Sequence, residues 1–366
     1  MWFCRHQFEN FLTLRNYLTI MANQKSLVET NQEKFVNKWP FFYGWVVMAA
    51  GTLGMIMTSP GQTYTESIFI EFLIRDINLS RSLISSLYSF GTLVGGFSLP
   101  LIGKQIDRFG PRKMITVVAL LFGAACIYMG FVQNAWMIGL GFIMIRMLGQ
   151  GSLGLISQTA INQWWNQKRG MVMGISGLLM ALLGMGAFPN LVHWLIAAFE
   201  WRMAYIILGF SLLLIMAPIG YFFVRDRPED FGLLPDGTDS TLADSVHLGL
   251  AAKPEQENWT LKEALRTHAF WVIAISSSLF ALVITGLTFH LVDIFQSQAL
   301  SAASAASVFL PIALTAALTN FVAGYLSDKI PLQYLMGIGL IFQAISLILA
   351  TIFGGTGLVF FLGVII

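Results

Sequence analysis

Apolar runs of about 20 residues, separated by short polar connections, recur along the chain from residue 42 onward. A helix needs roughly this length to cross the ~30 Å hydrocarbon core of a bilayer, because it rises about 1.5 Å per residue. A tenth run begins near Leu358 and continues to Ile366. The pattern predicts an all-α polytopic membrane protein. The nine complete spans are predicted over residues 42–65, 82–102, 114–133, 136–160, 171–198, 203–224, 269–292, 302–326 and 333–353.

Composition supports the same class. Apolar residues make up 56% of the 366 residues and charged residues only 11%, with a mean hydropathy of +0.71. Soluble domains carry about 25% charged residues, so a soluble enzyme, a nucleic-acid-binding module and a disulfide-rich secreted domain are excluded. Cys4 and Cys126 match neither a disulfide framework nor a metal-binding spacing. We find no motif of an intramembrane enzyme and expect no catalytic residue, cofactor or metal.

Basic residues are concentrated in the connections after the second and fourth spans. Because cytoplasmic connections are enriched in Lys and Arg, these connections and the N-terminus are predicted to face the cytoplasm from a bacterial inner (plasma) membrane. Four segments follow: a cytoplasmic segment over 1–41, a six-helix bundle over 42–224, a cytoplasmic central loop over 225–267 and a second bundle over 268–366. Met1 and Met21 both remain possible starts of the chain.

A short motif occurs twice, each time after the second span of a set. Gly103–Lys113 and Gly324–Lys329 both contain Gly, three residues, Asp and then a basic residue, and the two aspartates lie 221 positions apart. Repeated helix sets are typical of secondary transporters. The same offset places Ile366 opposite Ile145. We therefore expect about nine and a half spans, with the second half truncated inside span ten.

The repeated motif and one further segment carry a family resemblance. The two copies resemble the loop signature of the major facilitator superfamily, and Ile145–Gly151 resembles its fourth-helix signature with the arginine Arg146. A narrower resemblance, to the branch of oxalate/formate antiporters and monocarboxylate transporters, is carried by Phe42–Trp45, Ser59–Tyr64, Leu79–Ser82, Trp164–Gly170 and Arg227–Gly237.

The resemblance implies a 6+6 helix bundle that works by alternating access. The expected cargo is a small organic anion such as a monocarboxylate or oxalate, moved by symport or antiport. An ion gradient, often of protons in such carriers, or a substrate gradient is expected to drive it. The expected partners are the lipid bilayer and a small-molecule substrate, with no nucleic acid, and the protein is expected to be a monomer. Two alternatives stay open: an efflux carrier for amphipathic compounds, and a transport-dead truncated membrane protein.

Ionisable residues inside spans are costly and mark functional sites by default. Arg146 is the clearest; it either faces the substrate cavity or braces neighbouring spans through backbone carbonyls. Glu66 is either a proton carrier or a carboxylate at the outer rim of the bundle. The resemblance implies a lysine at this place in proton-coupled monocarboxylate carriers, so the charge in this chain is reversed. His290 and Asp293 share one helix face and form either a proton-sensitive gate or a wet helix end. The polar groups that could line the cavity are Tyr64, Tyr88 and Thr92.

The repeated motif is expected to act as a conformational latch between the two halves. The resemblance implies that its aspartates and basic residues hold the cytoplasmic ends together; the alternative is a basic loop that only sets topology. The predicted latch residues are Gly103, Asp107, Arg108, Gly110, Arg112, Lys113, Gly324, Asp328 and Lys329.

The eighth span departs from the narrower family resemblance. The monocarboxylate branch carries an Asp-Arg pair in helix eight, whereas residues 301–327 of this chain contain no charged residue.

Overall fold

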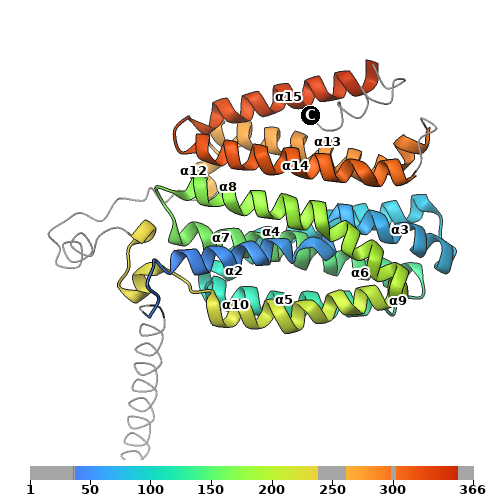
Figure 1. The fold of residues 1–366 in the computed structure, drawn as a ribbon, viewed down its shortest axis with the longest axis horizontal. Coiled ribbons are helices and arrows are strands. Elements are labelled where there is room, and N and C mark those ends of the chain that lie inside the picture. Colours follow the sequence, from blue (N-terminus) through green and yellow to red (C-terminus); the bar gives the residue numbers. More distant parts are fainter. Residues whose placement is uncertain (1–35, 37, 238–260, 298–301, 353–366) are drawn as a thin grey trace, which may run out of the picture.

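The computed structural model describes residues 36, 38–237, 261–297 and 302–352, and the described elements are helices. The helices run side by side along one direction (Figure 1). The fold class predicted from the apolar runs is confirmed. Five helical stretches of the described chain are long and apolar enough to cross a membrane. The tenth predicted run, from Leu358, lies outside the described residues.

The first predicted span differs most from its expected form. It consists of α2 (Gly44–Ile56), a short 3-10 turn (Ser59–Gly61) and α3 (Thr63–Ile77). The predicted end at residue 65 was therefore wrong, because the helix restarts after the turn and continues for more than three turns. Pro60 has no backbone N–H to continue a helical ladder, which accounts for the break.

The third span follows its predicted range to within four residues, whereas the second continues seven residues past its predicted end at 102, so Gly103, Asp107 and Arg108 lie on a helix and not in the predicted connection. α4 (Arg81–Phe109) is capped by the Ser80 hydroxyl, which accepts from the Leu83 backbone N–H. Gly110, at a φ of +79°, leads directly into α5 (Pro111–Met129). Such a φ suits glycine because other residues would strain their Cβ.

Spans four to six each contain a π-helical segment. Span four comprises α6 (Ala135–Ile145), a π-helical segment (Arg146–Leu153) and α7 (Gly154–Trp164). π-Helical turns are frequent at functional sites. Spans five and six are joined at Glu200, where φ is +67°. They comprise α8 (Arg169–Leu179), a π-helical segment (Met180–Ala187), α9 (Phe188–Ser211), a π-helical segment (Leu212–Met216) and α10 (Ala217–Phe223).

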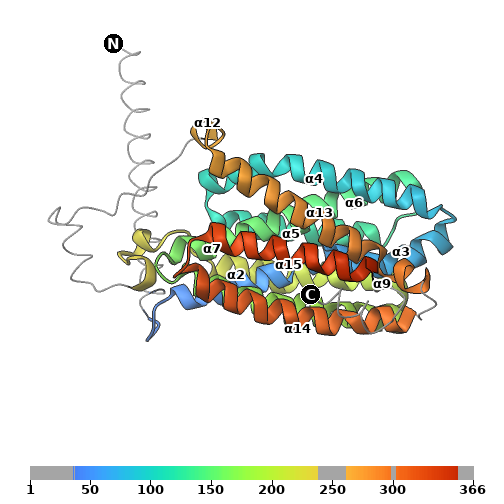
Figure 2. The same ribbon diagram turned by 90° about the horizontal axis from the view of Figure 1, so that it is seen from above.

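The later helices lie along one side of this first group (Figures 1 and 2). After the short α12 (Leu261–Ala264) come α13 (His268–Ser297), α14 (Ala302–Ser327) and α15 (Leu332–Ile352). α14 packs closely against α8, and this contact joins the two groups of helices.

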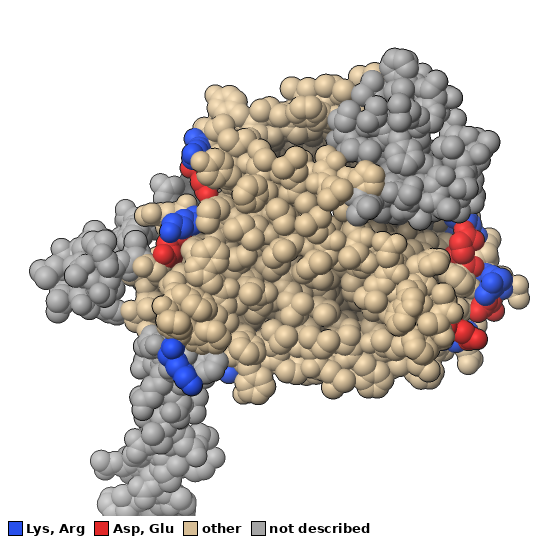
Figure 3. Space-filling view, viewed as in Figure 1, with Lys and Arg blue, Asp and Glu red and all other residues tan. Residues whose placement is uncertain are grey.

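On the face drawn in Figure 3, the exposed charged side chains lie at the two ends of the molecule, and an uncharged band separates them. Large apolar side chains such as Phe97, Leu214 and Leu282 are exposed on the outside. In water such a surface would be unfavourable, whereas hydrocarbon solvates it. We call the end that holds the connections with Lys104, Arg112 and Lys168 the basic end, and the opposite end the far end.

Candidate functional site

A buried polar cluster occupies the point where the first span breaks. Arg146, at the start of the π-helical segment of span four, is only 3% exposed. Its Nη1 donates to the Gly61 carbonyl at 2.8 Å, and its Nε donates to the Thr92 hydroxyl at 2.9 Å. Its guanidinium also lies 4.7 Å from the centroid of the Tyr88 ring. Arg146 therefore joins spans one, two and four.

The break in span one makes these contacts possible. An unbroken helix would bond the Gly61 carbonyl internally, whereas the 3-10 turn leaves it available for Arg146. A Cβ on Gly61 would lie 2.5 Å from the Ile145 carbonyl oxygen, so only glycine permits this approach. The brace predicted for Arg146 is thus present. Nη2 of Arg146 has no hydrogen-bond partner among the described residues.

Glu66 lies on α3, one turn after the break. Its side chain is 0% exposed, so protein surrounds the carboxylate on all sides. The Tyr205 hydroxyl donates to Oε2 at 2.8 Å, and Tyr205 itself stacks on Phe69. Oε1 is buried and has no hydrogen-bond partner in the described part of the chain. A buried carboxylate with one unpaired oxygen is unfavourable when charged and is readily stabilised by a proton.

Tyrosines connect the two charged groups. The ring of Tyr88 faces Arg146, and its hydroxyl donates to Thr63, one helical turn before Glu66. Tyr64 shares a 2.8 Å hydrogen bond with Ser59 in the 3-10 turn. The predicted cavity residues Tyr64, Tyr88, Thr92 and Arg146 therefore surround one break in one helix. His290 and Asp293 lie in α13, and their side chains fall outside the described residues.

The second copy of the repeated motif joins the two halves at the basic end. Asp328 accepts from the backbone N–H groups of Gly170 and Met171, both at 2.9 Å. These groups lie in the first turn of α8, where helical N–H groups lack partners within the helix. Asp328 thus caps a helix of the other half.

Glycines bring α8 and α14 close together at this end. A Cβ on Gly324 would lie 2.6 Å from the Gly170 carbonyl oxygen and 2.6 Å from the Gly174 Cα. Asn320 donates to the Gly177 carbonyl at 3.2 Å. Among the described residues, the Lys329 ammonium group donates only to the hydroxyl of Tyr325, four residues earlier.

The first copy of the motif makes different contacts. The Arg112 backbone N–H donates to Asp226 at 2.9 Å, and its Nε donates to the Tyr221 carbonyl. Both partners belong to the end of span six, so these contacts remain within the first half. Burial raises the pKa of Asp226. Asp107 is exposed and has no side-chain hydrogen bond or ion pair within the described ranges.

The remaining latch candidates differ in what surrounds them. Gly110 faces the Asp226 carboxylate, and a Cβ there would collide with it. The Arg108 guanidinium lies over the Phe109 ring. A Cβ on Gly103 would meet no described atom within 4 Å, and Lys113 is exposed at the start of α5.

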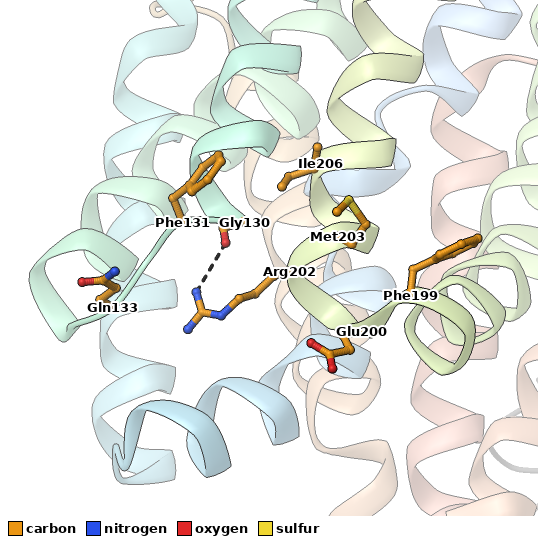
Figure 4. Close-up of a pocket in the computed structure, with 8 residues that line it drawn as sticks. All are labelled: Gly130, Phe131, Gln133, Phe199, Glu200, Arg202, Met203 and Ile206. Carbon is orange, nitrogen blue, oxygen red and sulfur yellow. Dashed lines mark hydrogen bonds between the residues drawn. The ribbon is translucent and has the colours of Figure 1, made fainter.

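An open hollow at the far end does not involve any predicted site residue (Figure 4). Its Arg202 donates to the Gly130 and Val132 carbonyls, which holds the end of α5 to α9. We assign it no ligand. The lining residues are Gly130, Phe131, Gln133, Phe199, Glu200, Arg202, Met203 and Ile206.

Sequence reasoning missed three polar residues of these sites. Tyr205, the partner of Glu66, lies 139 positions away along the chain. Asp226 and Asp236 bind backbone N–H groups at the basic end. The segment Arg227–Gly237 is marked in the sequence only by a resemblance, and neither periodicity nor spacing assigns its Asp236 a role.

A bundle of long apolar helices is typical of an integral membrane protein, and buried polar groups at a broken span are typical of transporters. The chain belongs to the Major Facilitator Superfamily, whose family model matches residues 51–366. Members of this superfamily act on small molecules within a lipid membrane. The superfamily predicted from the repeated motif and the fourth-helix signature is thereby confirmed.

Individual relatives and solved structures agree with this assignment. The chain is 24% identical to the MFS-type transporter YhjX of Escherichia coli K12 over 306 residues, covering 81% of this chain and 69% of YhjX. It is 25% identical to the oxalate:formate antiporter of Oxalobacter formigenes, over 40% of this chain and 34% of that protein. The fold is similar to that of the E. coli xylose transporter XylE, with a TM-score of 0.63, 18% identity and coverage of 88% and 83%.

Proposed function

We propose that the protein is a secondary active transporter that carries a small organic anion across the bacterial inner membrane by alternating access. An ion or substrate gradient supplies the energy, and the basic end faces the cytoplasm. Two relatives support the cargo class by their names: the oxalate:formate antiporter above and the probable sulfoacetate transporter SauU of Cupriavidus necator, 30% identical over 38% of this chain and 33% of SauU.

The geometry of Arg146 is the observation that carries the choice of an anion. Two of its nitrogens are held by Thr92 and Gly61, and the Tyr88 ring fixes the plane of the guanidinium. The N–H groups of Nη2 make no hydrogen bond to any described residue. A fixed guanidinium binds a carboxylate strongly because the planar fork loses little entropy and the hydrogen bonds are charge-assisted. Arg146 therefore serves as both brace and anion ligand.

Glu66 supplies the coupling proton in this proposal. Its unpaired Oε1 accepts a proton without displacing any existing hydrogen bond, because Tyr205 occupies only Oε2. Protonation removes a negative charge from the neighbourhood of the anion site, so proton and anion bind cooperatively. Release of one then favours release of the other.

Counterflow in liposomes tests the transport claim. The full chain is reconstituted, loaded with unlabelled oxalate, formate or sulfoacetate, and supplied with the same anion carrying a radioactive label. We expect transient accumulation of label with at least one of these anions. Movement of amphipathic cationic dyes without any anion would favour the efflux alternative. Movement of neither would contradict the proposed cargo and favour the transport-dead alternative.

Replacing Glu66 by Gln is expected to abolish proton-driven uptake while leaving exchange of anion for anion. Gln keeps the volume and still accepts from Tyr205, but it takes up no proton. Uptake of labelled anion under an imposed pH gradient should fall to the level without a gradient. The measurement is initial uptake against external pH, alongside counterflow at fixed pH.

Glu71→Gln is the matched control for this prediction. Glu71 lies on the same helix, is exposed and pairs with Arg81 at the far end. Exposed ion pairs contribute about 0–1 kcal/mol, so this variant should retain gradient-driven uptake. An unchanged pH profile in Glu66→Gln would remove Glu66 from the coupling mechanism.

A further inference from the structure

The N-terminal turn of α8 and the residues just before it are held by two carboxylates from different parts of the chain. Asp328, at the end of α14, accepts from Gly170 and Met171, as described above. Asp236 lies in the turn Pro235–Gly237 after span six and binds the three residues 166–168. Its Oδ2 accepts from the backbone N–H groups of Asn166 at 3.0 Å and Gln167 at 2.7 Å, and its Oδ1 accepts from that of Lys168 at 3.1 Å.

Asp236 belongs to a segment that is packed firmly against the first half. Phe231 stacks on Trp164, and the Trp164 indole donates to the carbonyls of Arg225 and Asp226. Gly237, on the other side of Asp236, approaches the Phe42 ring. Asp236 therefore moves with the first half, whereas Asp328 moves with the second.

The backbone at Asp236 indicates that this arrangement is specific. Its φ is +65°, in the left-handed region that non-glycine residues enter at an energetic cost, although Asp and Asn tolerate it best. The surrounding contacts and the three accepted hydrogen bonds offset that cost. The carboxylate is thereby directed at the 166–168 turn.

We infer that Asp236 is a positioning residue for closure of the basic end. By fixing residues 166–168 it orients the N–H groups that follow in the chain, those of Gly170 and Met171, for capture by Asp328. Without the carboxylate, three N–H groups of the turn lose their acceptor and the turn relaxes. This inference rests on the proposed alternating access, because closure matters to a transporter that opens and closes this end.

A competing effect has the opposite sign. Asp236 and Asp328 are like charges at one helix N-terminus, so removal of Asp236 would strengthen the hold of Asp328 if repulsion dominated. The two effects therefore predict opposite changes in closure, which makes the inference testable by measuring closure itself.

Maleimide labelling of the full chain in liposomes, with Ser327→Cys as reporter, measures closure. Ser327 is half-buried beside Gly170, where α8 and α14 meet, and peptide mass spectrometry separates its label from Cys4 and Cys126. We expect Asp236→Gly to raise the labelling rate about fivefold, because it removes the acceptor of three backbone N–H groups and a net loss of one hydrogen bond corresponds to about this factor. Glycine accepts the left-handed backbone without strain, so the change isolates the lost carboxylate.

A double-mutant comparison tests whether Asp236 acts through Asp328. Asp328→Ala should raise labelling by a similar factor, and the double variant should rise no further. Asp236→Asn, which also tolerates a positive φ but keeps one acceptor oxygen, should raise labelling by a smaller factor. Glu229→Gln, an exposed neighbour in the same segment, should label at the original rate.

Three results would overturn the inference: unchanged labelling in Asp236→Gly, slower labelling in that variant, or additive effects in the double variant. The assay contains no substrate. A protein that closes normally but moves no anion would therefore contradict the proposed transport and leave the role of Asp236 standing.

Discussion

Arg146→Ala is expected to reduce anion exchange to background in the counterflow assay. The change removes the guanidinium that would bind the anion and two buried hydrogen bonds that join spans one, two and four. Hydrogen bonds to charged groups contribute about 1.5–3 kcal/mol each, and an unsatisfied buried carbonyl at Gly61 costs a further ~1–3 kcal/mol. A free-energy loss on this scale lowers the fraction of the protein in which the site is assembled by more than about 100-fold.

One further variant separates the charge of Arg146 from its geometry, and a second serves as a control. Arg146→Lys keeps the positive charge but cannot reach Thr92 and Gly61 with one planar fork, so we expect weak residual exchange. Arg75→Ala removes an arginine whose side chain is 73% exposed and should exchange at the original rate. Thermal unfolding of each variant shows whether loss of exchange accompanies loss of the fold. Full exchange in Arg146→Ala would exclude both roles.

Gly324→Val is expected to hold the basic end open and to stop exchange. Even the first carbon of a side chain at Gly324 would lie 2.6 Å from backbone atoms of Gly170 and Gly174, which cannot rotate away. Overpacking of a tight contact costs about 1–3 kcal/mol and sometimes more, or roughly a 5- to 150-fold loss of the closed state. The measurement is exchange together with maleimide labelling at Ser327→Cys.

Gly96→Ala provides the matched control for the glycine prediction. Gly96 lies in α4, and a Cβ there would meet no described atom within 4 Å. Alanine is also the better helix former, so exchange should be kept. Normal exchange in Gly324→Val would mean that the α8–α14 contact is not required in the transport cycle.

The break in span one illustrates what hydropathy leaves undetermined. The apolar run predicted a span but placed its end near residue 65, whereas the helix restarts at Thr63 and continues to Ile77. Mean hydropathy is insensitive to a three-residue turn. The presence of Pro60 and Gly61 is compatible with a break, but the Arg146 contact that accompanies it comes from another helix.

Glu66 shows the same limit for a single side chain. Its position near the end of an apolar run suggested the headgroup layer, because a sequence run does not say which face of the helix a residue occupies. The partner that holds it, Tyr205, lies 139 positions away and carries no motif. Burial of Glu66 follows from the packing of α3 against α9 and could not be inferred from either segment alone.

The sequence by itself determined the all-α membrane class, the superfamily and the aspartates of the repeated motif as helix-end groups. The membrane class and the helix-end groups depend on local quantities, namely apolar length against bilayer thickness and residue type at a helix end, whereas the superfamily came from resemblance to short signatures. The tertiary structure alone decided that Asp328 caps α8, that Asp236 holds the preceding turn, and that Arg146 and Glu66 share one buried cluster. Such contacts join residues far apart in sequence, and their energies depend on burial and hydrogen-bond geometry, which exist only once the helices have packed.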